Sequence, residues 1–321
     1  MKNKIFSDQR RKVVVVGAGA VGATYCYSLA QSGLADDIVL IDKNDDLVQG
    51  QVLDLVHGQP FFPTVSIRVG KPADYSDASL VVITAGIGQK PGETRLELLK
   101  KNARIVGDIA AEVADQKCQG VLLIVSNPVD VMTYVALKRT GWNYGRVFGS
   151  GTILDSARLR HLLSNHCGVD IHSVHAYVLG EHGDSEFAAW SMTNIAGIPI
   201  DDYCRNCGNC ANWRSIQESI EKEVRDSAYQ IINYKGATNF AVGLAIVRIT
   251  GAILRGQRSV LSVSSLVNGE FGIDDVCLSV PCIVSGKGVV KIIKSPLPEN
   301  EVTALKSSAK ILKDAIREAG I

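Results

Sequence analysis

The chain has 321 residues, of which 46% are hydrophobic and 6% aromatic, and its 34 basic and 33 acidic residues leave a formal net charge of +1. This length allows two domains with apolar cores of their own, and the hydrophobic content excludes a disordered or fibrous protein. The even spread of charge lacks the concentrated basic patch that nucleic-acid binding requires.

No targeting segment is evident in the sequence. The charged run from Lys2 to Lys12 precedes an apolar run, Val13 to Val16, that is too short for the hydrophobic region of a signal peptide. No stretch approaches the roughly 20 apolar residues of a membrane span. We therefore expect a soluble, cytoplasmic protein with no membrane or nucleic-acid partner, whose eight cysteines are mostly buried thiols.

The first half of the chain alternates short β-branched runs with helix-length patterns. This alternation predicts a doubly wound parallel sheet, because strands buried on both faces read as continuous apolar runs. The expected strands are Lys12 to Val16, Ile38 to Ile41, Leu80 to Thr84 and Val121 to Val125, and the expected helices are Ala20 to Ser32, Asp45 to His57 and Glu93 to Gln116.

Three glycines, Gly17, Gly19 and Gly22, follow the first strand and open the first helical pattern. In this context the first allows a tight turn, the second lets the backbone approach a pyrophosphate, and the third lets helix and strand pack closely. Asp42 stands at the end of the next strand, where a carboxylate accepts both ribose hydroxyls but repels a 2′-phosphate. The sequence therefore predicts NAD as the cofactor, with a ligand-free glycine turn as the alternative.

Two more strands end in small or polar turns, Thr84-Ala85-Gly86 and Ser126-Asn127-Pro128. Both would lie at the carboxyl edge of the sheet, where cofactors bind, although either could be an ordinary strand terminator. The segment from Gln89 to Arg95 places Pro and Gly ahead of a helix, which is typical of a loop that folds over a ligand. Arg95 would then polarise a carbonyl on closure, and a solvated helix start is the alternative.

The pattern changes from about Thr152 onward to helices and shorter strands, which indicates an α+β domain with antiparallel pairing. We expect a nucleotide-binding domain over residues 1–150 and a substrate domain over residues 151–321, closely docked. The expected elements of the second are strands Ser173 to Val178, Ala189 to Ile195, Ser259 to Val267 and Val276 to Val284, a helical pattern from Asn212 to Leu254 broken at Gly236, and a last helix from Glu299 to Ala319.

The segment Gly-Glu-His-Gly-Asp-Ser-Glu, residues 180–186, places His182 on a glycine-flanked turn. A histidine so placed can transfer a proton near neutral pH. Asp155 and Arg158 lie three residues apart in a helical pattern and share a face. Asp155 would fix the tautomer of His182, and Arg158 would bind a substrate carboxylate. A structural histidine and a surface ion pair are the alternatives.

Together these motifs resemble the family of NAD-dependent L-lactate and malate dehydrogenases over nearly the whole chain. The resemblance implies a Rossmann-type first domain, with His182 as proton donor and acceptor, Asp155 as its partner, Arg158 as carboxylate clamp and Arg95 as the arginine of the mobile loop. It also implies that Asn127 hydrogen-bonds the substrate oxygen. The implied cofactor-lining residues are Gly17, Gly19, Val21, Gly22, Asp42, Tyr75, Gly86, Ile87, Asn127 and Ser150.

Within this family the substrate is selected at the position of Gln89, where malate enzymes carry a second arginine. Glutamine there, together with Thr238, implies pyruvate and L-lactate, because the second carboxylate of oxaloacetate would be buried without a partner. Arg160 and His175 resemble the residues by which some bacterial members bind fructose 1,6-bisphosphate, and a homotetramer is implied. A surface arginine and a strand histidine are the alternatives, and malate or a bulkier 2-hydroxy acid is the rival substrate.

Cys204, Cys207 and Cys210 are spaced closely enough to hold zinc or an iron-sulfur centre if a fourth ligand came near. The sequence offers no obvious fourth ligand. The favoured interpretation is therefore a surface loop with incidental thiols and no metal. The rival class of function is a metal- or redox-sensing binding protein built on a dehydrogenase fold, with these cysteines as its site.

Overall fold

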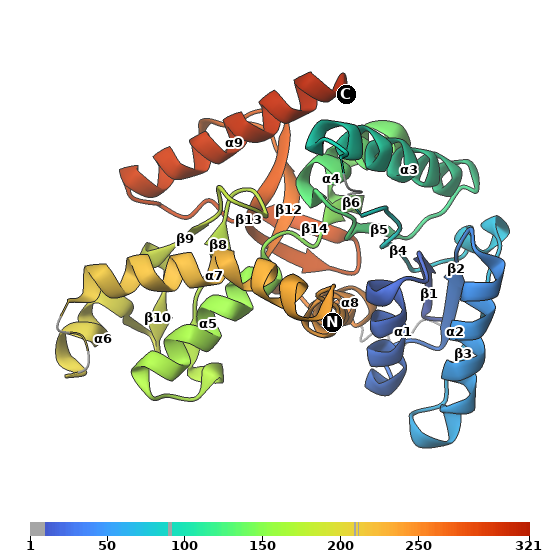
Figure 1. The fold of residues 1–321 in the computed structure, drawn as a ribbon, viewed down its shortest axis with the longest axis horizontal. Helices are drawn as coiled ribbons and strands as arrows, with labels where there is room; N and C mark the ends of the chain where they lie inside the picture. The colour runs from blue at the N-terminus through green and yellow to red at the C-terminus, as the bar shows by residue number, and fades with distance from the viewer. Residues whose placement is uncertain (1–9, 89–91, 209, 211) are drawn as a thin grey trace, which may run out of the picture.

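The computed structural model, which describes residues 10–88, 92–208, 210 and 212–321, is built on a nine-stranded sheet (Figure 1). Its strand order is β14-β13-β12-β6-β5-β4-β1-β2-β3. The six strands of the first half pair in parallel, in the order that reverses between β1 and β4 and confirms the doubly wound fold. They are β1 (Lys12–Val16), β2 (Asp37–Ile41), β3 (Ser66–Val69), β4 (Leu80–Ile83), β5 (Val121–Ile124) and β6 (Val147–Gly149).

The helices of the first half are α1 (Ala20–Ser32), α2 (Asp45–His57), α3 (Arg95–Asp115) and α4 (Val129–Thr140). The first two have the predicted bounds. The third begins two residues later than predicted, because Thr94 is its N-cap: the hydroxyl accepts from the Glu97 backbone N–H at 3.2 Å, and the Glu97 carboxylate accepts from the Thr94 N–H at 2.9 Å.

The second half extends the sheet of the first. Strands β12 (Ser259–Val267), β13 (Val276–Ser285) and β14 (Gly288–Ile292) form an antiparallel meander. Strand β12 pairs with β6, the outermost of the parallel strands, where Ser264 lies opposite Gly149. The antiparallel pairing expected for this half is present. The two halves, however, share one sheet.

The remaining part of the second half forms a lobe of helices and two-residue strands, seen beside the large sheet in Figure 1. Its helices are α5 (Ile153–Cys167), α6 (Ile200–Asn206) and α7 (Trp213–Lys235). Its strands are β7 (Val174–His175), β8 (Val178–Leu179), β9 (Phe187–Ala188), β10 (Asn194–Ile195) and β11 (Ile198–Pro199). Helix α8 (Phe240–Leu254) packs against α1 and belongs to the main core, and α9 (Glu299–Ala319) follows at the C-terminus. None of the described helices is both long enough and apolar enough to cross a membrane.

The predicted strand Ala189 to Ile195 is wrong over most of its length. Residues Trp190–Met192 form a 3-10 turn, and only Asn194–Ile195 pair as a strand. The Trp190 indole N–H donates to Glu221 of α7 at 2.6 Å, a tertiary contact that local sequence does not reveal. By contrast, the predicted break at Gly236 is confirmed: this glycine has φ of +84° at the end of α7.

Candidate active site

His182 and Asp155 form the centre of the site. The imidazole Nδ1 lies 2.7 Å from Asp155 Oδ2, a hydrogen bond between the turn after β8 and the first turn of α5. The turn is held against the sheet by a backbone exchange between Gly180 and Ser279 of β13. The His182 side chain is 25% exposed and that of Asp155 is 2% exposed, so the ring can reach a ligand while its partner cannot.

The surrounding carboxylates favour the charged form of His182. Partial burial alone would lower the pKa of the imidazole, but attraction to Asp155, with smaller effects from Glu186 and Asp130, raises it to about 9. The pKa of Asp155 is lowered, because His182 and Arg158 together outweigh the cost of its burial. The site therefore holds a proton on His182 at neutral pH.

Two acidic residues that the sequence analysis did not single out complete this environment. Asp130, in the first turn of α4, accepts a hydrogen bond from the His182 backbone N–H at 2.7 Å. Glu186 is buried with its carboxylate 3.9 Å from His182 Nδ1, and burial together with the nearby Asp155 raises its pKa. Glu186 lies in the same segment as His182, but only the fold reveals that its side chain turns inward.

Arg158 lies one helical turn beyond Asp155, as predicted from their spacing. Its NH1 group donates to Asp155 Oδ1 at 2.6 Å, and its side chain is 12% exposed. The carboxylate of Asp155 is thus shared between the histidine and the arginine. A guanidinium has five N–H donors in a planar fork, so this contact leaves donors for a bidentate grip on a ligand carboxylate.

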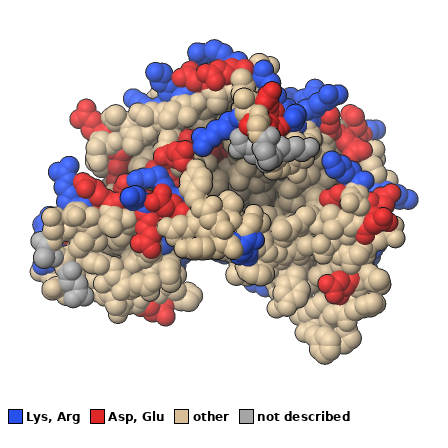
Figure 2. Space-filling view, in the orientation of Figure 1, with Lys and Arg blue, Asp and Glu red and all other residues tan. Residues whose placement is uncertain are grey.

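Arg95 is the first residue of α3, and its side chain is 84% exposed. Its guanidinium lies 3.9 Å from Asp184, two residues after His182, and Asp184 also accepts a hydrogen bond from the Tyr229 hydroxyl of α7 at 2.8 Å. Arg95 is therefore close to the histidine turn but free to move. Figure 2 shows the face of the molecule hollowed near its centre, below α3 and α9.

The glycine turn between β1 and α1 has the shape that a pyrophosphate needs. Gly17 has φ of +115°, and a Cβ there would lie 2.7 Å from the Thr84 hydroxyl and the Ala85 nitrogen. A Cβ on Gly22 would lie 1.9 Å from the Gly17 carbonyl oxygen. A Cβ on Gly19 would meet no atom within 4 Å, so the space in front of the α1 N-terminus is open. The N-cap residue, Gly19, has no side chain with which to cap the helix, so it leaves the first N–H groups of α1 available to an anion.

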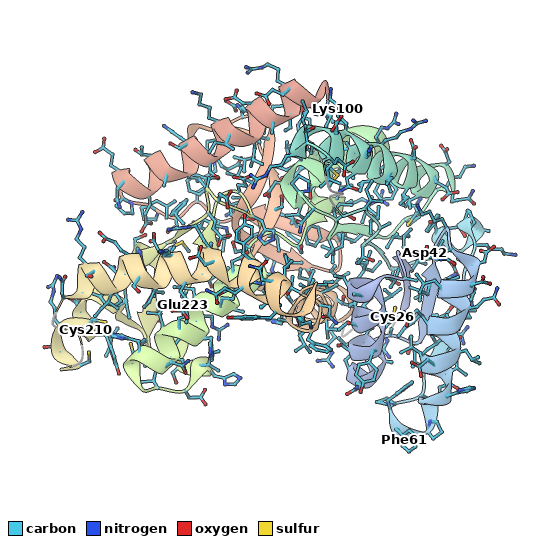
Figure 3. The ribbon with its side chains drawn as sticks, in the orientation of Figure 1. Cys26, Asp42, Phe61, Lys100, Cys210 and Glu223 are labelled. Carbon is cyan, nitrogen blue, oxygen red and sulfur yellow. The ribbon has the colours of Figure 1, made fainter. Side chains whose placement is uncertain are left out.

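Asp42 follows β2 at the same edge of the sheet, where Figure 3 labels it. One carboxylate oxygen accepts from the Ala18 N–H at 2.6 Å and the other from the Asn44 N–H at 2.9 Å. These bonds hold the acid beside the glycine turn. The residues present therefore fit a dinucleotide with an unphosphorylated ribose.

Asn102 of α3 joins two of the predicted cofactor segments, and the sequence analysis missed it. Its side-chain oxygen accepts from the Ile87 N–H at 2.9 Å, and its amide donates to the carbonyls of Ile87 at 3.2 Å and Asn127 at 3.1 Å. Gly86 packs against the same amide. Asn102 lies three residues after Leu99 and four before Val106, on the apolar face of α3, and a polar residue at that helical spacing was the signal available in the sequence.

The remaining predicted cofactor and substrate residues are less uniform in position. Val21 lies in the first turn of α1 and Ser150 directly after β6, both next to the carboxyl edge. Thr238 is half-buried in the loop between α7 and α8, and the next residue, Asn239, donates to Thr24 of α1. Gln89, on which the choice of substrate rests, lies outside the described residues.

The structure does not bring Tyr75 to this edge. Tyr75 is 1% exposed, and its neighbour Asp74 pairs with Lys12 at the start of β1, which is the amino edge of the sheet. A parallel strand places its two ends on opposite edges, so Tyr75 lies away from the glycine turn. The tyrosine fills the core beside α3, where burial raises the pKa of its hydroxyl.

Arg160 and His175, the predicted effector residues, lie on neighbouring elements of the lobe. Arg160 is on α5, where its NH2 group donates to the Ile171 carbonyl at 3.3 Å, and its buried Nε has no hydrogen-bond partner among the described residues. His175 is exposed on β7. The structure thus gives a contact between α5 and β7, the elements that carry the two residues.

Two groups of side chains in the described part of the chain have the donor types of a metal site. The first, Asp155, His182 and Glu186, coincides with the histidine pair, whose Nδ1 is already bonded to Asp155. The second is the cysteine cluster, Cys204, Cys207 and Cys210, at the far end of the lobe.

Comparison with known families gives matches over both halves. The model of the lactate/malate dehydrogenase NAD binding domain matches residues 11–149, and that of the lactate/malate dehydrogenase alpha/beta C-terminal domain matches residues 152–320. The L-lactate dehydrogenase of Treponema denticola is 57% identical over 312 residues, covering 97% of this chain and 99% of that protein. The L-lactate dehydrogenase of a Thermoanaerobacter species is 49% identical over 310 residues, covering 97% and 99%.

Solved structures give the same result for the fold. A lactate dehydrogenase from a deep-sea metagenome library superposes with a TM-score of 0.94 at 42% identity, covering 98% of this chain and all of the other. The minor L-lactate dehydrogenase of Enterococcus mundtii superposes with a TM-score of 0.93 in its ligands-bound form, at 40% identity over 97% of this chain and 98% of that one. The ligands-unbound form of the same enzyme superposes with a TM-score of 0.89.

Proposed function

Because the chain belongs to the lactate/malate dehydrogenase family and is an NAD-dependent oxidoreductase of the L-lactate dehydrogenase type, we propose that it interconverts pyruvate and (S)-lactate through His182. The observation that carries this proposal is the hydrogen bond of 2.7 Å between His182 and the buried Asp155, with Arg158 on the other carboxylate oxygen. The pair supplies a proton donor beside a clamp for a carboxylate.

The nicotinamide group, when bound, supplies or accepts the hydride. The glycine turn and the α1 N-terminus would hold the pyrophosphate, and Asp42 the ribose. This fit rests on the open space at Gly19 and on the carboxylate held beside it. We propose that further residues line the cofactor, because they follow or flank strands at this edge of the sheet. They are Val21, Gly86, Ile87, Asn127 and Ser150.

The chain's own residues account for the remaining steps. Arg158 binds the substrate carboxylate, and protonated His182 donates its Nε2 proton to the ketone oxygen while Asp155 stabilises the ring. In the reverse direction neutral His182 accepts the hydroxyl proton. Arg95 reaches the ketone oxygen when the loop before α3 closes, and the exclusion of water strengthens its contact with the developing negative charge. Asn127 adds a hydrogen bond to the same oxygen.

The test is turnover by the purified protein and its His182→Ala variant. The variant is expected to bind NADH normally, because the proposed cofactor contacts do not involve the imidazole, and to lose most of its turnover, because the proton donor is gone. Near-normal turnover in the variant would remove His182 from the mechanism. NADH oxidation with pyruvate against oxaloacetate tests the substrate, and a preference for oxaloacetate would overturn the role of Gln89 and Thr238 while leaving the proton transfer intact.

We further propose that fructose 1,6-bisphosphate activates the protein through Arg160 and His175. The support is the contact between α5 and β7 and the buried Nε of Arg160, which has no hydrogen-bond partner in the described part of the chain and which a phosphate could satisfy. The two residues would meet their copies across a two-fold axis of a homotetramer. A sugar bisphosphate should then lower the pyruvate concentration at half-saturation, and an unchanged curve would refute the effector site.

We also propose that the protein works in the cytoplasm, at the end of fermentative glycolysis. Residues up to about 150 would bind the cofactor, and the residues after that would bind the substrate. Sedimentation of the purified protein tests the tetramer. A monomer that remains fully active would contradict both the assembly and the shared effector site.

A further inference from the structure

The three cysteines near the end of the lobe turn their sulfur atoms toward one point. Cys204 lies on α6 and is 2% exposed, Cys207 is the C-cap of that helix, and Cys210 follows three residues later. Their Sγ atoms all lie within 4.8 Å of one another, and Cys207 and Cys210 are 3.4 Å apart. Incidental thiols on a surface loop have no reason to converge in this way.

A fourth donor reaches the cluster from a different part of the chain. His166 lies in the last turn of α5, and its Nε2 is 3.1 Å from the Sγ of Cys210. The ring is held there by Trp213, the first residue of α7, which stacks on it with a centroid distance of 6.2 Å and an interplanar angle of 27°. The sequence could not reveal this ligand, because 38 or more residues separate it from the cysteines and only the packing of both α5 and α6 against α7 brings it near.

We propose that His166, Cys204, Cys207 and Cys210 form a structural zinc site. Three thiolates and one imidazole are a donor set that zinc prefers, and such sites are tetrahedral with four protein ligands. A tetrahedral zinc ion needs sulfur atoms about 3.7 Å apart and the ring nitrogen about 3.5 Å from each sulfur, given the usual bond lengths. The distance of 3.4 Å between the Cys207 and Cys210 sulfur atoms and that of 3.1 Å between His166 Nε2 and Cys210 are close to these values. His166 stands outside the set of three thiols whose sulfur atoms all lie within 4.8 Å of one another, so its ring has to turn further toward Cys204 and Cys207 when the metal binds.

The position of the site suggests what the metal does. The lobe has a separate, smaller apolar core, to which Cys204 and the neighbouring Cys167 belong. Helix α6 has only seven residues, too few to be stable alone. A zinc ion would link the C-terminal end of α5 to the C-terminal end of α6 and to Cys210 beyond it, and so stabilise this small core. Figure 3 shows Cys210 at the opposite end of the molecule from Asp42, so the metal has no part in hydride transfer.

The first measurement is the zinc content of the protein, with any affinity tag removed, after expression in zinc-supplemented medium and purification under reducing conditions without chelator. About one zinc ion per chain is expected. Elemental mass spectrometry measures the total zinc, and a zinc-binding dye measures the zinc that a thiol-blocking mercurial releases. Replacement of zinc by cobalt should give the sulfur-to-cobalt charge-transfer band and tetrahedral d–d bands. The cobalt should also quench fluorescence, because Trp213 and Trp190 are two of the three tryptophans and lie 5.5 Å apart beside the site.

Variants assign the ligands. Cys210→Ser and His166→Ala should each reduce the zinc content about tenfold or more, since a three-ligand site binds far more weakly. Cys26→Ala, a buried cysteine in α1, is the matched control and should retain the metal. Cys167→Ser tests the other nearby thiol, and it should retain the metal as well. NADH binding by Cys210→Ser should match that of the parent protein, which separates this test from the proposed dehydrogenase activity.

Three results would overturn the proposal. A zinc content below one-tenth per chain, unchanged after incubation of the reduced protein with zinc alone, would exclude the site. A disulfide between Cys207 and Cys210 in freshly purified, metal-free protein would show that the cluster is a redox pair. Loss of zinc in Cys167→Ser with retention in His166→Ala would replace the histidine by a fourth thiolate and refute the ligand set stated here.

Discussion

Replacing Asp155 by Asn removes the charge that keeps His182 protonated while preserving the shape of the side chain. In the parent protein the pKa of His182 is raised to about 9, against an ordinary value of 6.5, although partial burial opposes the rise. That difference corresponds to about 3 kcal/mol in favour of the imidazolium. Asp155 is the largest source of this attraction, so most of it should disappear in the variant.

The expected result is a change in the pH profile of pyruvate reduction. The parent enzyme should keep its rate from neutral pH up to about pH 9 and lose it above, because reduction needs the protonated ring. In Asp155→Asn the loss should begin near or below pH 7, and the rate at neutral pH should fall by a factor on the order of 10⁴, as for a catalytic histidine that loses its orienting carboxylate.

The assay is the steady-state kcat/KM for pyruvate with saturating NADH, measured at constant ionic strength from about pH 5 to about pH 10. NADH fluorescence titration provides the control, because the cofactor site should be unaffected. An unchanged apparent pKa in the variant, with normal NADH binding, would refute the argument that Asp155 sets the protonation of His182.

Other residues give sharper tests of single features. Gly22→Ala should destabilise the protein by about 2 kcal/mol or more, since its Cβ would lie 1.9 Å from the Gly17 oxygen. Gly19→Ala should leave the melting temperature unchanged but weaken NADH binding, because its Cβ would enter the open space before α1. Equal losses of melting temperature in the two variants, measured by calorimetry, would contradict the open space at Gly19. Arg95→Gln should keep the Kd for NADH and lower kcat about 100-fold or more, and a change in KM alone would assign it to binding. Because the folded-state pKa of His182 is raised, the contribution of this residue to the free energy of unfolding should be complete below about pH 6.5 and disappear as the pH rises through about 9. Urea unfolding at a series of pH values should show this loss of stability in the parent protein and not in His182→Ala.

The parts of the fold that were predictable from sequence are those that local chemistry determines. The bounds of α1 and α2 follow from a glycine turn and from the cap at Asn44, and the break after α7 follows from the positive φ of Gly236. The pairing of Asp155 with His182 was also predictable, because the resemblance placed both in one reaction. The structure now gives their contact as 2.7 Å.

The features that escaped prediction depend on contacts between distant segments. The two- and three-residue strands of the lobe and of β6 are too short to show a periodic pattern, and Trp190 leaves the strand conformation to bond Glu221. Glu186 looks like an ordinary polar residue until packing turns it inward. The ligand His166 is of the same kind, because it approaches the cysteines only through the packing of three helices.

The shared sheet has a consequence for how the molecule can come apart. The pairing of β12 with β6 means that neither half owns a complete sheet, since separation of the halves would leave an unpaired strand edge on each. Rigid-body opening between the two family segments is therefore costly. The continuous sheet predicts that both halves unfold in one cooperative thermal transition. It also predicts that a fragment ending near residue 150 would expose the unpaired backbone of β6, which favours aggregation with other copies of the fragment.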